Sequence, residues 1–180
     1  MTYHHGDLRR AILDEALRVI ATDGPTALSL RDLARRAGVS HAAPAHHFKD
    51  KAGLLTAIAI DGYERLAVAL EAGSSLLELG AAYVRFALDH PAHFEVMFSP
   101  DLYHSSDVDL AAARARTAAS LQAAAATMPG GQRDTALAAW SLAHGFATLW
   151  STGSMARLAG RQDPVRLFRT IARGTFPAPD

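Results

Sequence analysis

Apolar residues recur at helical spacing along almost the whole chain, whereas the strict alternation that marks a half-buried β-strand is nearly absent. In the first such stretch, "DLRRAILDEALRVIATDG", one helical face carries Leu8, Ile12, Ala16, Val19 and Ile20. Asp7 is in position to cap this helix, and Gly24 is in position to end it. The pattern continues along the chain and predicts an all-α fold with about nine helices.

The remaining helices are predicted from the same spacing and from residues that start or stop helices. Ser29, with Asp32 three residues later, has the spacing of a capping box, and Gly38 is suited to end that helix. Ser40 is expected to cap the very short helix that follows, and the final "FPAPD" is expected to fray. The predicted helices after the first cover residues 30–37, 40–48, 51–70, 74–89, 91–98, 107–128, 133–151 and 164–173.

Length and composition favour a soluble protein of one large domain or two small ones. The chain has 180 residues, of which 49% are hydrophobic and 20% are charged. It has no cysteine, which excludes a disulfide framework and a thiolate metal site. The sequence shows neither an apolar signal core nor a run of about 18 apolar residues, so we expect a cytoplasmic protein without a membrane segment.

Signatures of catalysis are lacking, so we expect no enzyme and assign no cofactor and no metal. The sequence has no cysteine nucleophile, no HExxH pattern and no Gly-rich phosphate loop. His90 and His93 have a helical spacing, but Pro91 between them indicates a helix boundary rather than a rigid metal-binding face.

Positive charge is slightly concentrated near the N-terminus. The net charge of the chain is zero, which by itself argues against a nucleic-acid partner. Residues 1–51 hold eight Lys and Arg against six Asp and Glu, a balance of +2, and the rest of the chain has the opposite balance of −2. The asymmetry is mild and decides nothing without a motif.

Residues 29–48 have the pattern of a helix-turn-helix, with a tight glycine turn between two short helices. The second helix of such a pair lies in the DNA major groove. Pro44 and Phe48 are expected to face inward, which leaves a small, histidine-bearing outer face. Lys49 and Lys51 follow at the start of the next helix, where side-chain charge and backbone N–H groups suit a phosphate. The predicted DNA contacts are Ser29, Arg31, Ser40, His41, Ala42, Ala43, Ala45, His46, His47, Lys49 and Lys51.

Each of these features also has an ordinary structural explanation. Short helix-turn-helix segments occur in proteins that never touch DNA, adjacent histidines are often only solvated, and "KDK" is also a common start of a helix. A helical small-molecule carrier without DNA binding is therefore the competing function. The outer surface of residues 40–51 distinguishes the two, because a carrier would have no reason to build it.

The N-terminal third of the chain resembles a known family. The stretch from Tyr3 to Leu55, "YHHGDLRRAILDEALRVIATDG…LSLRDLARRAGVSHAAPAHHFKDKAGLL", is similar to the DNA-binding domain of TetR-type transcriptional regulators. Further on, "AAWSLAHGFATLW" contains Trp140, His144 and Gly145 and resembles the Trp-His-Gly signature of one C-terminal subclass of that family.

Two residues depart from the pattern of the family. Ala45 stands where the family usually has a tyrosine that helps hold the DNA backbone, so that contact is lost or is made by His46. Pro44 occupies a position that is commonly apolar or β-branched. It is expected near the fourth helical position, where its missing N–H would cost one hydrogen bond.

The resemblance implies a homodimeric, ligand-responsive repressor that binds a palindromic operator in double-stranded DNA. Residues 1–51 would bind DNA, residues 52–180 would bind the ligand and dimerise, and the helix over 51–70 would connect the two parts. The ligand would be small and mostly apolar. Its candidate contacts, which are equally well explained as ordinary core, are Phe86, Phe94, Met97, Phe98, Leu121, Trp140 and His144.

The helix over 133–151 is apolar nearly all round, so it needs cover on every side. One face can pack within its own domain and the other against a second copy of the chain. The alternatives are a central core helix of a monomer and, for His144, a core histidine bonded to a carbonyl. The candidate dimer contacts are Leu137, Trp140, His144 and Phe168.

Overall fold

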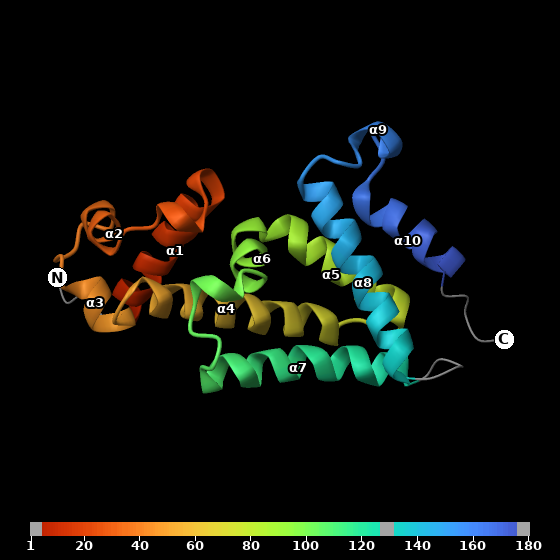
Figure 1. The fold of residues 1–180 in the computed structure, drawn as a ribbon, viewed down its shortest axis with the longest axis horizontal. Helices are drawn as coiled ribbons and strands as arrows, with labels where there is room; N and C mark the ends of the chain where they lie inside the picture. The colour runs from red at the N-terminus through yellow and green to blue at the C-terminus, as the bar shows by residue number, and fades with distance from the viewer. Residues whose placement is uncertain (1–4, 127–131, 176–180) are drawn as a thin grey trace. The chain divides into compact units, whose positions relative to one another are not determined.

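The computed structural model of the protein describes residues 5–126 and 132–175. These residues form α-helices and two 3₁₀ turns and contain no strand, which confirms the predicted all-α class (Figure 1). The elements are α1 (His5–Asp23), η1 (Pro25–Ala27), α2 (Leu30–Arg36), α3 (Ala43–Phe48), α4 (Lys51–Glu71), α5 (Leu76–Asp89), α6 (Pro91–Met97), η2 (Pro100–Leu102), α7 (Val108–Ala125), α8 (Gln132–Ser151), α9 (Ala156–Ala159) and α10 (Pro164–Thr175).

The structure has ten α-helices in its described part, one more than the sequence predicts, because α9 was missed. This helix has only four residues, too few to show a helical period, and it is preceded by Gly153 and followed by Gly160, both with positive φ. α1 begins at His5, so the predicted start of this helix at Asp7 is two residues too late. The predicted end of a helix at Met128 and the predicted frayed tail fall outside the described residues.

The chain divides into two compact units. The first comprises Met1–Gly62 with Pro91–Ala111, and the second comprises Tyr63–His90 with Ala112–Asp180. Helices α4 and α7 each run from one unit into the other. The stretch that contains α6 and η2 therefore belongs to the same unit as the two short helices of the helix-turn-helix.

In the first unit, α1 supplies the buried face against which α2, α3 and α6 pack (Figure 1). The predicted inner stripe of α1 is confirmed in large part, since Ile12, Ala16 and Ile20 are almost completely buried. α6 approaches α4 closely because Gly62 has no side chain: a Cβ there would lie 2.6 Å from Sδ of Met97.

In the second unit, α5 packs against α8 and α10. The contact between α5 and α10 also depends on a glycine, because a Cβ on Gly80 would lie 2.8 Å from the ring of Phe168. The same ring meets Phe146 of α8 edge-on at 5.4 Å between centroids. Ser75 caps α5 by accepting the Glu78 N–H at 3.3 Å. No helix in the described residues is long and apolar enough to cross a membrane.

Candidate nucleic-acid interface

The first helix of the predicted helix-turn-helix is capped at both ends as its sequence indicates. The Ser29 hydroxyl accepts the Asp32 N–H at 3.5 Å, and the chain leaves α2 at Gly38, whose φ is +67°. The Val39 N–H then donates to the Ala34 carbonyl at 3.0 Å. Ala34 is completely buried, which allows α2 and α3 to pack at close range.

The second helix starts later than predicted. α3 begins at Ala43, its N-cap residue Ala42 makes no side-chain cap, and Ser40 therefore does not cap it. Ser40 instead accepts the Ala43 N–H with its backbone carbonyl at 3.0 Å. The late start changes the role of Pro44, which occupies the first turn, where a helix has no internal acceptor for the N–H that proline lacks. The expected loss of a hydrogen bond at Pro44 is thus wrong.

The outer surface of α3 has the small and polar character that the sequence predicts. Pro44 and Phe48 are buried, and Ala43 and His47 are half-buried. The rings of His46 and His47 meet edge-on with their centroids 5.4 Å apart, and the centroid of the His47 ring lies 6.2 Å from that of Phe48. The remaining predicted contacts of this region are exposed, namely Ser40, His41, Ala42, Ala45, His46 and Lys49.

A tight turn that was not predicted joins α3 to α4. Lys49 has φ +67° and ψ −63°, and the Asp50 N–H donates to the Phe48 carbonyl at 2.9 Å. These values define a classic γ-turn, a rare and strained conformation. Asp50 then caps α4 by accepting the Gly53 N–H at 2.7 Å. A Cβ on Gly53 would lie only 2.0 Å from the Phe48 carbonyl oxygen, so glycine is required there.

The hydrogen bond from the Gly53 N–H holds the pKa of the Asp50 carboxyl below its usual value, and nearby His104 acts in the same direction. Nε2 of His104 lies 3.4 Å from Oδ1 of Asp50. The aspartate that follows the γ-turn is therefore ionised at neutral pH and is contacted from another part of the same unit. A glycine two residues into a helix was the sequence signal that this turn is unusual.

Lys51 is already engaged within the protein. Its Nζ donates to the Thr26 carbonyl at 2.7 Å, which ties the start of α4 to η1. Lys49, in contrast, is exposed at the γ-turn. The two lysines that the sequence treats alike thus have different surroundings, and Lys49 is the better placed of the two for a phosphate.

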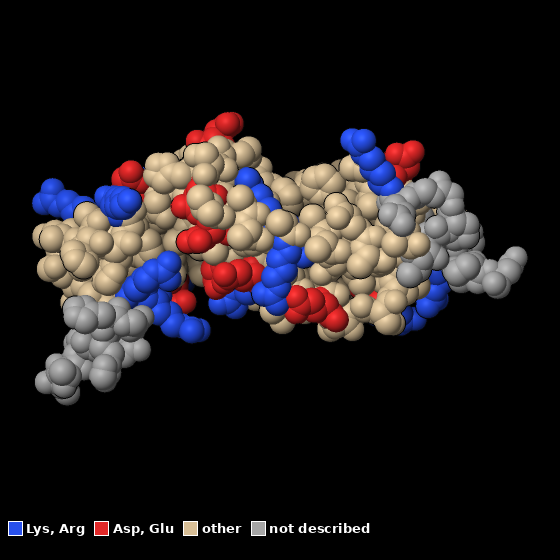
Figure 2. Space-filling model, turned by 90° about the horizontal axis from the view of Figure 1, so that it is seen from below, with Lys and Arg blue, Asp and Glu red and all other residues tan. Residues whose placement is uncertain are grey.

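The basic side chains of α1 and α2 are partly neutralised by acids of the same helices. Asp32 pairs with Arg35 and, at 2.6 Å, with Arg36, and these hydrogen bonds hold the pKa of the Asp32 carboxyl below its usual value. Arg9 lies over the ring of Phe48, with its guanidinium carbon 5.3 Å from the ring centroid. On the face shown in Figure 2, Lys and Arg side chains project from the part of the molecule that holds α1 to α3.

The candidate ligand contacts divide between the two units. Phe94, Met97 and Phe98 lie on or next to α6 in the first unit, where the rings of Phe94 and Phe98 are 4.9 Å apart. The other candidates, which lie in the second unit, are Phe86, Leu121, Trp140 and His144.

A polar cluster that the sequence reasoning missed surrounds His144. Its Nδ1 lies 2.9 Å from the hydroxyl of Tyr83, so one of its partners is a side chain of α5. Burial raises the pKa of the Tyr83 hydroxyl, and this effect outweighs a hydrogen bond from Trp140 that lowers it. Burial lowers the pKa of His144. Tyr83 carried no sequence signal, because it follows the ordinary core spacing of α5.

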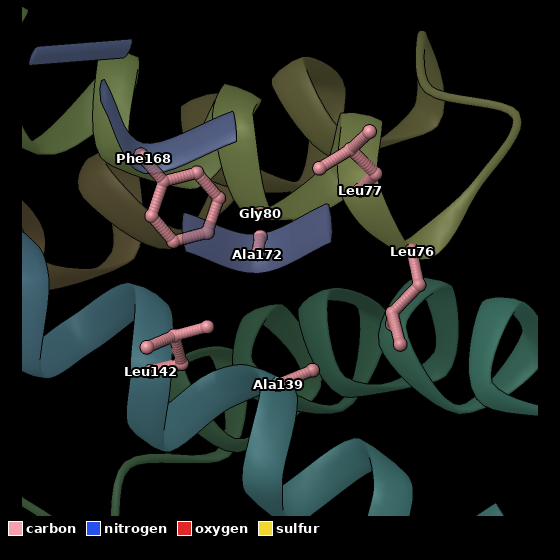
Figure 3. Close-up of a pocket in the computed structure, with 7 residues that line it drawn as sticks. All are labelled: Leu76, Leu77, Gly80, Ala139, Leu142, Phe168 and Ala172. Atoms are coloured by element: carbon pink, nitrogen blue, oxygen red, sulfur yellow. The ribbon is translucent and has the colours of Figure 1, made fainter. Parts of the chain in front are cut away.

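A small apolar pocket lies between α5, α8 and α10 (Figure 3). The ring of Phe168 and the methyl of Ala172 face it from α10, and Leu142 and Ala139 face it from α8. The residues of α5 that complete its wall are Leu76, Leu77 and Gly80. None of the ligand contacts predicted from the sequence lines this pocket.

The outer face of α8 exposes large apolar side chains and carries no charged residue after Asp134. Leu137, Trp140 and Leu149 are 49%, 42% and 49% exposed, while Ala143 and Phe146 on the opposite face are buried. No Asp, Glu, Lys or Arg occurs between Asp134 and Arg157. The helix therefore has one buried and one exposed apolar face, as its sequence predicts. Phe168, however, is only 2% exposed within the protomer, so its side chain has almost no surface left for a partner.

These features place the protein in the class of all-helical helix-turn-helix regulators. The C-terminal domain of tetracycline-repressor-like proteins matches residues 76–174, and the family model of bacterial regulatory proteins of the tetR family matches residues 12–58. The chain therefore belongs to the TetR family of transcriptional regulators, as its N-terminal sequence predicts.

Solved structures share this fold over nearly the whole chain. A protein of unknown function from Rhodococcus sp. RHA1 is 37% identical, with 98% of this chain and 96% of that chain covered and a TM-score of 0.76. SCO4313, a candidate regulatory protein, is 27% identical, with 96% and 98% covered and a TM-score of 0.80.

A sequence relative of known name is similar over a short segment only. The HTH-type transcriptional regulator BetI of Rhizobium meliloti (strain 1021) is 47% identical over 49 residues, which are 27% of this chain and 24% of BetI. The match thus spans about a quarter of that relative's length. The match is too short to carry the ligand of that relative over to this protein.

Proposed function

We propose that this protein is a homodimeric repressor that binds a palindromic operator through α3 and responds to a small, mostly apolar ligand. The observation that carries the proposal is the surface of α3: a short helix between the Gly38 turn and the γ-turn at Lys49, with an outer face of alanines and histidines. Such a face has little to contribute to a core and permits close approach to a groove.

In this proposal residues 1–51 bind DNA, and residues 52–180 bind the ligand and dimerise, with α4 connecting the two parts. His41, Ala42, Ala45 and His46 face the bases from the start and outer side of α3, with Ala43 and His47 at the edge of that surface. Ser29, Arg31, Ser40 and Lys49 contact phosphates, and Lys51 supports them from its bond to Thr26.

The exposed apolar face of α8 is the proposed dimer contact, centred on Leu137 and Trp140, with His144 at its inner edge. An exposed apolar stripe without a single Asp, Glu, Lys or Arg is costly in water, and a second copy of the same face would cover it. Phe168 is not part of this contact but supports α8 from behind, through Phe146.

The proposed ligand is small and apolar, and it binds within the second unit among Phe86, Leu121 and Trp140, with Tyr83 and His144 as the polar groups that orient it. The Trp140-His144-Gly145 series supports assignment to the Trp-His-Gly subclass. We propose a regulatory and not a catalytic role, with the cytoplasm as the place of action, because the family match concerns regulators.

Selection of bound duplexes from a random DNA pool tests this function. We expect enrichment of an imperfect palindrome whose half-sites are about one helical turn, or a multiple of it, apart. Binding should weaken steeply with salt, because phosphate contacts release counterions. Weak, salt-insensitive binding without an enriched palindrome would refute the proposal and favour a carrier instead.

A further inference from the structure

The stretch that follows α5 is fastened to α4 by buried polar groups. Among the described residues, Thr56 and His93 are the polar or charged side chains that are fully buried, with 4% and 5% exposure. Nε2 of His93 lies 2.8 Å from Oδ2 of Asp61 on α4. Both buried polar groups therefore join α4 to the stretch 91–107, and they do so within one compact unit.

Thr56 makes this connection at the end of α4 that is nearer to the γ-turn. Its hydroxyl donates to the Ala52 carbonyl at 2.8 Å and accepts the backbone N–H of His104 at 3.0 Å. His104 belongs to the η2 segment, which we define as residues 99–107. One residue earlier in this segment, Tyr103 is buried and donates from its hydroxyl to the Met97 carbonyl at 2.9 Å.

The same segment reaches the residue that follows the γ-turn. The backbone N–H of His104 donates to the Thr56 hydroxyl, and the His104 ring contacts the Asp50 carboxylate, which caps α4. Both side chains of the His104–Asp50 contact are exposed to solvent, so this contact contributes little free energy by itself. The bond to the Thr56 hydroxyl is the stronger part, because that hydroxyl is buried and an N–H that loses such an acceptor has no equivalent partner within the protein.

We propose that Thr56 is a positioning residue for DNA recognition. By holding the η2 segment on the first turns of α4, its hydroxyl stabilises the strained turn at Lys49 and thereby the orientation of α3. A strained backbone conformation persists only where the surrounding structure holds it in place. The η2 segment is part of this surrounding structure for the turn at Lys49. The inference rests on the proposed binding of DNA by α3.

The experiment compares three variants of the full chain. Thr56→Val keeps the shape of the side chain and removes the hydroxyl, and Thr56→Ser restores the hydroxyl. Thr117→Val is the matched control, because the Thr117 hydroxyl also bonds backbone carbonyls, those of Tyr63 and Ala113 at 3.2 Å, but in the other unit. The probes are the duplex most enriched from a random pool by the parent protein and a scrambled duplex of equal length.

Thr56→Val should bind the enriched duplex about threefold to tenfold more weakly than the parent, a size typical of residues that act through others. Its preference for the enriched over the scrambled duplex should narrow, because base contacts depend on the orientation of α3 more than phosphate contacts do. Thr56→Ser should recover both properties, and Thr117→Val should keep them.

Hydrogen exchange without DNA provides a readout that does not depend on the proposed function. In Thr56→Val the amides of residues 50 and 104 should exchange faster than in the parent. Unchanged exchange, or affinity and preference that match those of Thr117→Val at equal melting temperature, would overturn the role of Thr56. If the parent itself enriches no duplex, the proposed function fails, while the exchange data still test the fastening of the η2 segment.

Discussion

The hydroxyl of Tyr83 lies 2.9 Å from Nδ1 of His144, and both belong to helices that pack together, α5 and α8. Burial lowers the pKa of His144 and raises that of Tyr83, so at neutral pH both side chains are uncharged. A neutral imidazole can accept the phenol proton at Nδ1, whereas an imidazolium cannot. Protonation of His144 therefore prevents Nδ1 from accepting the phenol proton and places a charge on a partly buried ring beside an apolar helix face.

Stability should consequently fall in mild acid. Below about pH 6.5 the unfolded chain binds a proton at His144 that the folded chain binds only at a lower pH. The free energy of unfolding should therefore decrease as pH falls below that value and should level off once the pH is below the folded pKa. Urea unfolding at a fixed protein concentration between pH 8 and pH 5 measures this. His144→Gln should show a weaker dependence, and equal pH profiles would contradict the assignment.

Gly53→Ala should destabilise the protein and impair DNA binding together. The new methyl would meet the Phe48 carbonyl oxygen, which is backbone and cannot move without opening the γ-turn. We expect a loss of about 1–3 kcal/mol in the free energy of unfolding. Gly174→Ala is the control, since a Cβ there has nothing within 4 Å and alanine favours the helix. Similar denaturation midpoints for the two variants would show that the turn tolerates a side chain.

Lys49 and Lys51 should affect DNA binding differently. Lys49→Ala should weaken all duplexes about equally and lower the slope of log affinity against log salt by about one, as expected for one phosphate contact. Lys51→Ala should change this slope less, because its Nζ bonds the Thr26 carbonyl. Titrations at several salt concentrations separate the two effects. A larger change of slope for Lys51→Ala than for Lys49→Ala would show that Lys51 makes the phosphate contact that the sequence predicts.

Leu137→Asp should convert the proposed dimer to a folded monomer. The side chain is 49% exposed in the protomer, so the charge is tolerated in the monomer but is buried without a partner in the proposed contact. Leu158→Asp is the control, because Leu158 is 88% exposed on α9, outside that contact. Light scattering gives the oligomeric state, and circular dichroism verifies folding. A Leu137→Asp protein that remains dimeric would place the interface elsewhere.

Ala45→Tyr should strengthen DNA binding. Ala45 is exposed on α3, so a larger side chain fits without disturbing the core, and the resemblance to the family places a backbone-holding tyrosine at this position. We expect about a threefold to tenfold gain, in the range of one added hydrogen bond to a charged group. Ala45→Phe lacks the hydroxyl and should gain less. Fluorescence anisotropy with the enriched duplex compares the three proteins.

The sequence alone was sufficient for the all-α class, the helix-turn-helix and the family. These properties are local: helical period, the Ser29 cap and the Gly38 turn depend on neighbours only a few residues away. The two faces of α8 were predictable for the same reason, because a helix turns apolar residues outward at fixed intervals. The start of α3 was not predictable in this way. Ser40 has the composition of a helix cap, but its backbone carbonyl instead closes a turn by accepting the Ala43 N–H.

Only the tertiary structure decided which residues meet across long separations in the chain. Thr56 with His104, Tyr83 with His144 and Lys51 with Thr26 are far apart in sequence, and nothing in their spacing indicates their contact. Phe168 has the character of an interface residue, yet α10 turns it onto Gly80 and Phe146. Local sequence determines which face of a helix is apolar, but the packing of the other helices determines what covers that face.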